Sequence, residues 1–581
     1  MQFRNRTAAA LLAPAAALLA FAYALPLAGI VLDSLHVAGV ASLDNYHRLF
    51  ATPVFLRIVW RTVRLAALTT GICLLLGYPL AYWLARMRSG WRPALLLLVS
   101  VPFFTSILIR SYAWVAILGN NGLVNRALMA IGLTDSPVRM MFNEAGTLIG
   151  MAQIQLPLMV LTLYGVMLRI DRLLLRAAHS LGADPCTAFY TVFLPLSRPG
   201  LVAGLSLVFT SCLGFYTTPA MLGGPGQYVV TQAVEARVTA MSDGGTASAE
   251  GTLLLAAVAL LMVLFRRRLG LALPASGGLG ADAGWGRRSA EWPRLIAAIA
   301  RRLAAALTQV GEALLVLLAG VALVMLVLPI LVVVPLAFSS APFLAFPPPG
   351  VSLRWFAAYL SDPDWIASTW FSFWVSAVAA SLATALGMLS AHALVRLRPR
   401  GGATIYLLWA SPLVLPHLVI AVSLYGLLAH MRLIGNPLTF VAAYAVLGLP
   451  YPLVVLAAAL QKLDPILEQA AATLGAPPAA AWRTVTLPLI FTALASGFVF
   501  AFLVGFDDLV VSLFLASPGA YPLPLRMWDD IRQEISPRIA AVAVVFFGVA
   551  LAASVLLGVA RTVWRRASDA FSTRREFGLG Q

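Results

Sequence analysis

The sequence predicts an all-α protein that crosses a membrane about twelve times and consists of two homologous halves of about six helices each. Composition is the first observation behind this fold class, because 61% of the 581 residues are hydrophobic and only 11% are charged. A soluble protein has about 25% charged residues. The second observation is an internal repeat, since the segment at residues 176–183 recurs 293 residues later, at 469–476.

The repeat extends well beyond this segment. It aligns without a gap from residue 156 to 204 in the first half and from 449 to 497 in the second, with Asp171 opposite Asp464. An internal repeat of this length indicates two halves built to one plan. Each repeated segment is moderately polar and stands between apolar runs. We therefore expect a loop that the membrane spans deliver to the same side twice.

Long apolar runs predict the spans themselves. A run of about 18 or more apolar residues is typical of a membrane-spanning helix. Pro and Gly interrupt the third and fourth runs of each half, so these are expected to be the least regular. The runs centre on residues 8–32, 58–85, 94–118, 144–168, 198–221 and 247–265, and then on 312–338, 366–394, 403–429, 437–460, 489–515 and 538–560.

Arginines cluster in alternate loops between these spans. The positive-inside rule places such loops in the cytoplasm, so both repeated segments and both chain termini are predicted to be cytoplasmic. This topology also explains the net charge of +17. We therefore expect the chain to be surrounded by membrane lipid and do not expect it to bind nucleic acid. The clusters lie at residues 4–6, 86–92, 169–176, 266–302, 396–400 and 561–575.

The two halves are predicted to be joined on the cytoplasmic side. Residues 1–268 form the first transmembrane domain, residues 311–581 form the second, and the Gly-, Ala- and Arg-rich residues 269–310 are interpreted as a plain tether between them. The apolar run near the N-terminus continues past Pro26 to Leu32. It is longer than the roughly 7–15 apolar residues of a secretory signal, so we expect it to be the first span.

No catalytic or metal-binding pattern is present. The three cysteines are far apart and the six histidines are scattered, without the spacing of a metal site. The single lysine, Lys462, follows Gln461, whereas a Walker A loop needs Gly-Lys followed by Ser or Thr. We therefore predict that the chain binds no cofactor, and that any ATP is used by another polypeptide.

The repeated loops have the composition of short helices with sharp exits. Paired alanines form helix well with almost no side chain, glycines allow a turn after the helix, and prolines begin the next span. Such a helix fits a groove on a partner, and a plain connection between two spans is the alternative. The residues are Ala177, Ala178, Gly182 and Pro195 in the first copy and Ala470, Ala471, Gly475 and Pro488 in the second.

These residues resemble the permeases of binding-protein-dependent ABC importers. In that family a cytoplasmic loop carries Glu-Ala-Ala, three residues, Gly and a later Leu-Pro, and it docks into an ATPase subunit as a coupling helix. Here Arg176 and Gln469 stand at the glutamate position, with Glu468 displaced by one residue. The departure removes an expected charge contact but leaves the packing role of the loop.

Four other runs of sequence resemble a narrower group within this family. Residues 101–125 look like the first permease of spermidine/putrescine importers, and 411–422, 506–512 and 526–537 look like the second. The resemblance implies a fusion of two permeases with the type I ABC importer fold, in the inner (plasma) membrane of a bacterium. It implies an ATPase partner, expected to be a homodimer, and a periplasmic solute-binding protein.

The implied substrate is a polyamine or another small organic cation. Ferric-iron and thiamine importers also have fused permeases, so they are the alternatives within this class. A secondary transporter driven by an ion gradient is also built from repeats, but it has no ATPase for the matched loops to engage. A membrane-embedded enzyme would need a catalytic group, and the sequence shows none.

Acidic residues at membrane depth are candidates for the substrate path. If the eleventh span begins near Ile490, Asp507 lies about 26 Å along it, toward the outer face, with Asp508 beside it. Tyr216 of the first half is an aromatic candidate for holding an ammonium group. Glu144, at the start of the fourth span, is a weaker candidate. The alternative for all four is a position at the lipid headgroups.

Overall fold

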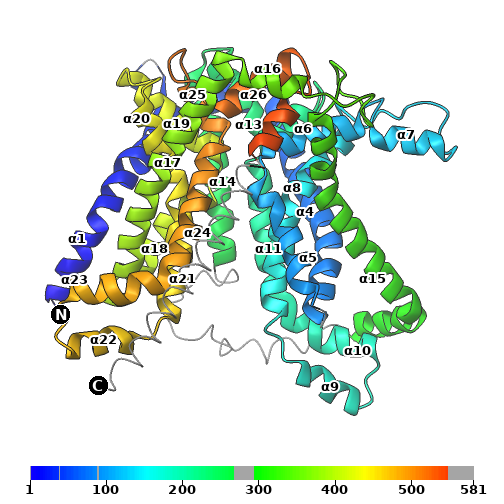
Figure 1. The fold of residues 1–581 in the computed structure, drawn as a ribbon, viewed down its shortest axis with the longest axis horizontal. Helices are drawn as coiled ribbons and strands as arrows, with labels where there is room; N and C mark the ends of the chain where they lie inside the picture. The colour runs from blue at the N-terminus through cyan, green and yellow to red at the C-terminus, as the bar shows by residue number, and fades with distance from the viewer. Residues whose placement is uncertain (1, 38, 88–89, 267–293, 547, 549–581) are drawn as a thin grey trace, which may run out of the picture.

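The computed structural model describes residues 2–37, 39–87, 90–266, 294–546 and 548, and these are almost entirely helical (Figure 1). One two-stranded hairpin, β1 (His36–Val37) and β2 (Val40–Ala41), pairs His36 with Ala41. The all-α prediction is confirmed.

The described residues of the first half form fourteen α-helices and three short π or 3-10 turns, here labelled η. They are α1 (Gln2–Leu19), η1 (Ala20–Ala24), α2 (Leu25–Ser34), α3 (Asp44–Ala51), α4 (Pro53–Arg86), α5 (Arg92–Ser100), η2 (Val101–Phe104), α6 (Ile107–Leu118), α7 (Leu123–Ala130), α8 (Glu144–Met167), α9 (Arg172–Ser180), α10 (Pro185–Ala188), η3 (Phe189–Phe193), α11 (Leu194–Leu213), α12 (Thr217–Leu222), α13 (Val230–Thr239) and α14 (Gly244–Arg266).

The second half follows the same order over its described residues. Its elements are α15 (Arg294–Ala337), α16 (Arg354–Leu360), α17 (Pro363–His392), η4 (Ala393–Leu397), α18 (Gly402–Ala410), η5 (Ser411–Leu413), α19 (His417–His430), α20 (Pro437–Gly448), α21 (Pro450–Lys462), α22 (Pro465–Thr473), α23 (Pro478–Ala481), η6 (Trp482–Thr486), α24 (Leu487–Phe506), α25 (Val510–Leu515) and α26 (Leu523–Gln533).

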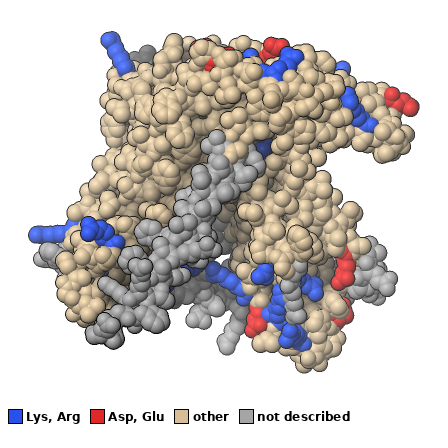
Figure 2. Space-filling model, in the orientation of Figure 1, with Lys and Arg blue, Asp and Glu red and all other residues tan. Residues whose placement is uncertain are grey.

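Nine helices in the described part of the chain are long and apolar enough to cross a membrane, or up to eleven if each of two bent pairs is one span. The polytopic prediction is therefore confirmed. The twelfth expected span, at 538–560, lies mostly outside the described residues. Figure 2 shows the reason for membrane insertion, because the sides of the bundle that face the viewer are almost free of charged side chains.

The third span is broken in both halves. In the second half, Gly402–Leu413 and His417–His430 meet at 93°, with Pro416 directly before α19. In the first half, η2 separates α5 from α6. A proline removes one backbone donor and disfavours continuous helix. The fourth span differs between the halves, because α20 and α21 meet at 41° whereas α8 continues through Pro157.

The first helix of each half lies against the other half (Figure 1). Helix α15 packs on α4, α5, α6 and α8, while α1 packs on α17, α20 and η4. The repeat in the sequence is therefore not a boundary in space. Of the expected tether at 269–310, residues 269–293 lie outside the described part, and residues 294–310 form the beginning of α15.

Each half is centred on three packed helices, α4, α8 and α11 in the first and α17, α21 and α24 in the second. A glycine allows the close approach in both. A Cβ atom at Gly204 would lie 2.7 Å from Met159 Sδ, and one at Gly497 would lie 2.9 Å from Pro452 Cα. Both glycines and both contacted residues are matched by the repeat. Small residues are typical of close helix contacts in membranes.

The two halves converge at one end of the molecule and diverge at the other (Figure 1). The diverging end carries α9, α10, α22, α23 and the first turn of α1, and the converging end carries α6, α13, α25 and α26. Figure 2 shows Lys and Arg side chains gathered over the region of α9 and α10. The repeated loops thus lie at one common end, facing away from the contact between the halves.

Candidate functional site

The two repeated loops form the exposed helices α9 and α22. An aspartate begins each helix, since Asp171 Oδ1 accepts a hydrogen bond from Leu173 N at 2.8 Å and Asp464 Oδ1 accepts one from Ile466 N at 2.9 Å. An aspartate in this position satisfies a backbone donor that the helix leaves free. The repeat therefore preserves the start of the helix.

Both helices end in the same Schellman motif. Gly182 has φ +85° and Gly475 has φ +83°, and within the described part of the chain neither has an atom within 4 Å of the place where a Cβ would stand. Gly182 N donates to His179 O at 2.9 Å, and Gly475 N donates to Ala472 O at 3.0 Å. Glycine is required here because the left-handed backbone is strained for other residues.

Apolar side chains point away from the protein at matched positions of both loops. Leu181 and Leu474 are each 88% exposed. Ala177 and Ala470 are also exposed, while Ala178 and Ala471 are half-buried. Exposed apolar residues grouped in this way indicate a surface for a partner. The first turns add two more exposed pairs, Leu173 with Leu174 and Ile466 with Leu467.

The side chains at the family's glutamate position face solvent, whereas the neighbouring Glu468 binds within the protein. Arg176 and Gln469 are exposed. Glu468 instead binds within the chain, accepting a hydrogen bond from Thr486 Oγ1 at 2.7 Å and pairing with Arg396 Nη2 at 3.3 Å. The pair ties α22 to the end of the long helix formed by α17 and η4.

The segment after each helix leads into the next span through a π turn. Pro195 and Pro488 stand in the first turn of α11 and α24, directly after η3 and η6. Asp184 begins α10, and its hydrogen bonds hold the pKa of its carboxyl below the usual value, the largest contribution coming from the Thr187 hydroxyl. Its counterpart in the second half is Pro477, so only the first loop has this carboxylate cap.

Asp507 lies at the converging end, where it joins the two halves. It follows α24, and its Oδ2 accepts a hydrogen bond at 2.9 Å from the backbone N of Ile107, the first residue of α6. A carboxylate at a helix N-terminus is stabilised by the helix dipole. Arg110 lies one turn further along α6, is 5% exposed and interacts electrostatically with Asp507.

Asp508 is buried beside this contact, with 6% of its surface exposed. Its Oδ2 accepts a hydrogen bond from Val511 N at 2.7 Å at the start of α25. Its Oδ1 lies 3.7 Å from Nδ1 of His417, whose side chain is 41% exposed. Asp508 and His417 therefore form a carboxylate–imidazole pair that reaches the surface through the histidine.

The other two path candidates contact other residues. Tyr216 is buried, and its ring centroid is 6.0 Å from that of Trp528 on α26. Glu144 forms an ion pair with Arg64 of α4 inside the first half. The structure thus brings Asp507 and Asp508 together with Arg110 and His417, and Glu144 takes no part in that group.

The converging end has an internal symmetry. Gly214 occupies the position in the repeat that Asp507 occupies in the second half. A Cβ atom at Gly214 would lie 2.8 Å from Pro416 Cβ, just before α19. Each half therefore presses the end of one span, α11 or α24, against the broken third span of the other half.

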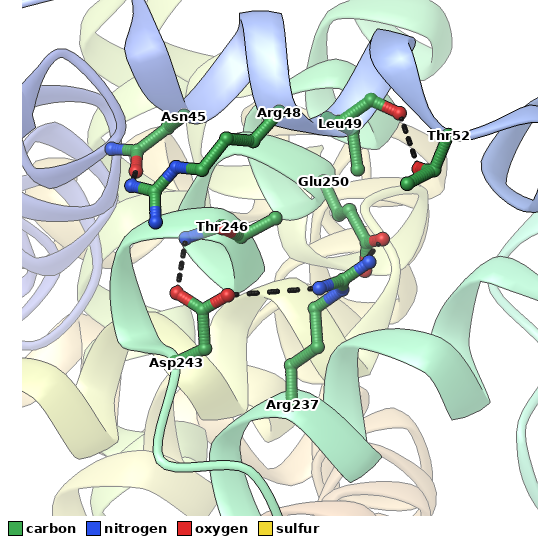
Figure 3. A network of polar contacts seen from close by, with 8 residues as sticks. All are labelled: Asn45, Arg48, Leu49, Thr52, Arg237, Asp243, Thr246 and Glu250. Carbon is green, nitrogen blue, oxygen red and sulfur yellow. Dashed lines mark hydrogen bonds and ion pairs between the residues drawn. The ribbon is translucent and has the colours of Figure 1, made fainter.

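A separate polar network fixes the corner between α13 and α14 (Figure 3). Arg237 Nε lies 2.9 Å from Oε1 of Glu250, which is 1% exposed in its side chain, and Arg237 Nη1 lies 3.6 Å from Asp243 Oδ2. Asn45 of α3 lies beside this corner (Figure 3) and donates to the carbonyl oxygens of Ser34 and His36. The network orients α13 near the contact between the halves.

The sequence analysis did not identify Arg110 or His417 as site residues. Both stand inside apolar runs, and a charged or titratable residue at membrane depth is a signal of function. His417 lies 3.7 Å from Asp508 and Arg110 interacts electrostatically with Asp507, so residues that are far apart in the sequence come together. Only the packing of α6 and α19 against the end of α24 brings them together.

The sequence model of one family matches both halves. Its description is "Binding-protein-dependent transport system inner membrane component", and it matches residues 73–272 and 383–569. The two matched segments cover more than half of the chain and begin within α4 and α17. They leave out α1 and α15, the helices that are exchanged between the halves.

Among curated proteins, the chain is similar to permeases of polyamine systems. It is 39% identical over 160 residues to the spermidine/putrescine transport system permease protein PotB of Escherichia coli K12, covering 28% of this chain and 58% of that protein. It is 37% identical over 151 residues to PotB of Haemophilus influenzae, covering 26% of this chain and 52% of that protein. The match therefore spans little more than half the length of these relatives.

A further relative is matched over more of its length. The chain is 36% identical over 208 residues to the putrescine transport system permease protein PotI of Escherichia coli K12, covering 34% of this chain and 73% of that protein. Among solved structures, one bacterial alginate ABC transporter with a pentasaccharide-bound periplasmic protein is 21% identical, with a TM-score of 0.39, covering 45% of this chain and 94% of that one.

Proposed function

The chain belongs to the family of binding-protein-dependent transport system inner membrane components, and from that premise we propose that it forms both permease halves of an importer driven by a separate ATPase. The observation that carries the proposal is the pair α9 and α22. They share the aspartate start, the Schellman end and the exposed leucines Leu181 and Leu474. Two like helices at one end suit a partner with two like grooves.

The partner on this side is an ABC ATPase, a homodimer in the simplest arrangement, in the cytoplasm together with both termini of the chain. ATP is bound and hydrolysed there, because the permease has only Lys462 and no Walker lysine. Movement of α22 reaches α17 and α24 through Glu468, Arg396 and Thr486. Residues 1–268 and 311–581 act as the two permease domains, with 269–310 joining them.

The substrate we propose is a polyamine such as putrescine or spermidine, delivered by a periplasmic binding protein at the converging end. Similarity to the permease proteins PotB and PotI supports this class. Asp508, the nearby Asp507 and the exposed His417 supply negative charge and a hydrogen-bonding group near the contact between the halves. Tyr216 and Glu144 remain candidates for other parts of the path.

The proposal also gives Asp507 a mechanical part. The hydrogen bond that its carboxylate accepts from Ile107 N links the two halves where they converge. Inward transport requires this end to open for substrate and then to close behind it. A cation arriving beside Asp507 competes with the α6 N-terminus for the Asp507 carboxylate, which couples arrival of the substrate to separation of the halves.

Reconstitution tests the proposal. The purified chain is placed in liposomes with the ATPase and binding protein encoded beside it, and ATP-dependent uptake of labelled putrescine and spermidine is measured, with thiamine and ferric iron as competing substrates. We expect polyamine uptake with the full set and no ATP turnover by the chain alone. ATP hydrolysis by the isolated chain contradicts the dependence on a partner. Uptake of thiamine or iron but not polyamine contradicts the substrate class.

A further inference from the structure

A cavity of about 360 Å³ lies between α9, the ends of α4 and α8, and η3. Arg86, Arg172, Arg176 and His179 line it, and among the described residues no acidic side chain lines it. The arginines come from two elements, since Arg86 ends α4 while Arg172 and Arg176 belong to α9. Basic groups therefore converge on one space from a membrane span and from the repeated loop.

Arg86, Arg172 and Arg176 each have N–H donors beyond those used in hydrogen bonds within the protein. Arg172 Nη2 donates to Ala85 O at 2.8 Å, and Arg86 Nη1 donates to the Tyr82 hydroxyl at 2.6 Å. Each guanidinium has five N–H donors. Within the described part of the chain none of the three forms an ion pair. Glu312 of α15 interacts electrostatically with Tyr82 but does not line the cavity.

The second half supplies an acid where the first half has none. By the repeat, Leu175 corresponds to Glu468 and Phe193 corresponds to Thr486. Glu468 pairs with Arg396 and accepts a hydrogen bond from Thr486, so the basic group there is neutralised within the chain. Leu175 and Phe193 line the cavity instead. The first half has Arg172 and Arg176 where the second half has Pro465 and Gln469, and it has Leu175 where the second half has the acid Glu468.

We propose that this cavity binds a phosphate group at the cytoplasmic end of the first half. Arginine pairs bind phosphate oxygens through parallel N–H donors, and a pocket of this size accommodates a headgroup or a small phosphate ester. The spans α4 and α8 end at Arg86 and Met167, which sets the cavity at the depth of inner-leaflet headgroups. Basic pockets between spans on this side are typical lipid phosphate sites.

The bound phosphate takes the place that Glu468 holds in the second half, and it joins α9 to the end of α4. Its source is the headgroup of an anionic phospholipid or a soluble phosphate ester. The site does not depend on the substrate, and it rests on the proposed function only in that α9 lies on the cytoplasmic side of the membrane.

Binding to the full chain in phosphatidylcholine nanodiscs tests the site. The probes are phosphatidylglycerol, followed by native mass spectrometry, and glycerol 3-phosphate, followed by calorimetry. The double variant Arg172→Gln/Arg176→Gln removes two donors, and Leu175→Glu introduces the internal acid of the second half. We expect at least about tenfold weaker binding in both. Arg483→Gln, an exposed arginine after α22, is the matched control and should bind as the unchanged chain does.

The two probes identify the source. Binding of phosphatidylglycerol that excess glycerol 3-phosphate does not displace supports a lipid headgroup, and binding of glycerol 3-phosphate with the same sensitivity to the variants supports a soluble ester. Arg176→Lys keeps the positive charge but not the parallel donors, so it should weaken binding less than the double variant does, which distinguishes lost phosphate contacts from misfolding. The proposal is overturned if neither probe binds the unchanged chain, or if the Arg172→Gln/Arg176→Gln and Arg483→Gln proteins bind alike.

Discussion

Asp507 Oδ2 accepts a hydrogen bond of 2.9 Å from the backbone N of Ile107, so the end of a span in the second half caps a helix of the first half. The counterpart of this contact is apolar, because Gly214 meets Pro416 where the first half presses on the second. One contact is charged and the other depends on close packing. They are expected to respond differently to substitution.

Replacing Asp508 by Asn should lower polyamine uptake about ten- to hundredfold, because an attractive charge is lost at a partly dehydrated site. Asn has nearly the same volume, so assembly should change little. Labelled putrescine uptake in the reconstituted system measures the effect. Asp364→Asn, at a residue whose side chain is 73% exposed, is the control. Uptake equal to that of the control would remove Asp508 from the substrate path.

Replacing Asp507 by Asn should lower uptake to a similar extent and should also loosen the contact between the halves. The amide oxygen can still accept from Ile107 N, but the buried Arg110 loses its nearby negative charge. An uncompensated buried charge is destabilising. Cysteine cross-linking between the end of α24 and the start of α6 reports the loosening. Unchanged cross-linking with unchanged uptake would contradict both parts.

Replacing Gly214 by Val should keep the converging end from closing fully. Its Cβ would lie 2.8 Å from Pro416 Cβ and 3.0 Å from Pro416 Cα, too close for packing without displacement. Spin-label distances between α11 and α19 should lengthen. Gly165→Val is the matched control, because its Cβ meets no atom within 4 Å. Equal distances in the two variants would show that the contact between residue 214 and Pro416 accommodates the larger side chain without separating the helices.

Replacing Gly182 or Gly475 by Val should abolish coupled transport while the protein still inserts in the membrane. A side chain in the left-handed conformation costs roughly 1–2 kcal/mol, and the space around both glycines is open, so the effect comes from the backbone. Gly→Asn at the same positions is the control, since Asn tolerates this conformation. We expect Gly475→Val to be the more damaging, and association with the ATPase measures it. Equal and mild losses at both sites would argue against docking.

Replacing Glu468 by Gln should loosen α22 from the end of α17. The change removes the ion pair with Arg396 but keeps an acceptor for Thr486, so a loss of about 1–2 kcal/mol is expected. Amide exchange in α22 should then be about tenfold faster. Gln469→Glu alters the exposed neighbouring residue and should leave exchange unchanged. Amide exchange in α22 that stays as slow as in the unchanged chain would mean that the ion pair between Glu468 and Arg396 does not hold the helix in place.

Local features of the two loops were predictable from the sequence. The turns at Gly182 and Gly475 depend on the conformation of a few neighbouring residues. The repeat also matched Asp171 with Asp464, but their role in starting the helices became visible only in the structure. The apolar runs likewise defined most spans, because membrane insertion depends on composition over about 20 residues. Pro157 is an exception, since α8 continues through it while Pro450 marks a bend between α20 and α21.

The sequence by itself therefore determined the repeat, the membrane class and the matched loops, which follow from periodicity, composition and short-range hydrogen bonding. The tertiary structure decided which helices are neighbours. It exchanged α1 and α15 between the halves, turned Glu468 toward Arg396 and brought Asp507 to Ile107. The physical reason is that an apolar helix is equally compatible with many neighbours in lipid, and the choice is made by side-chain packing and buried polar contacts between distant segments.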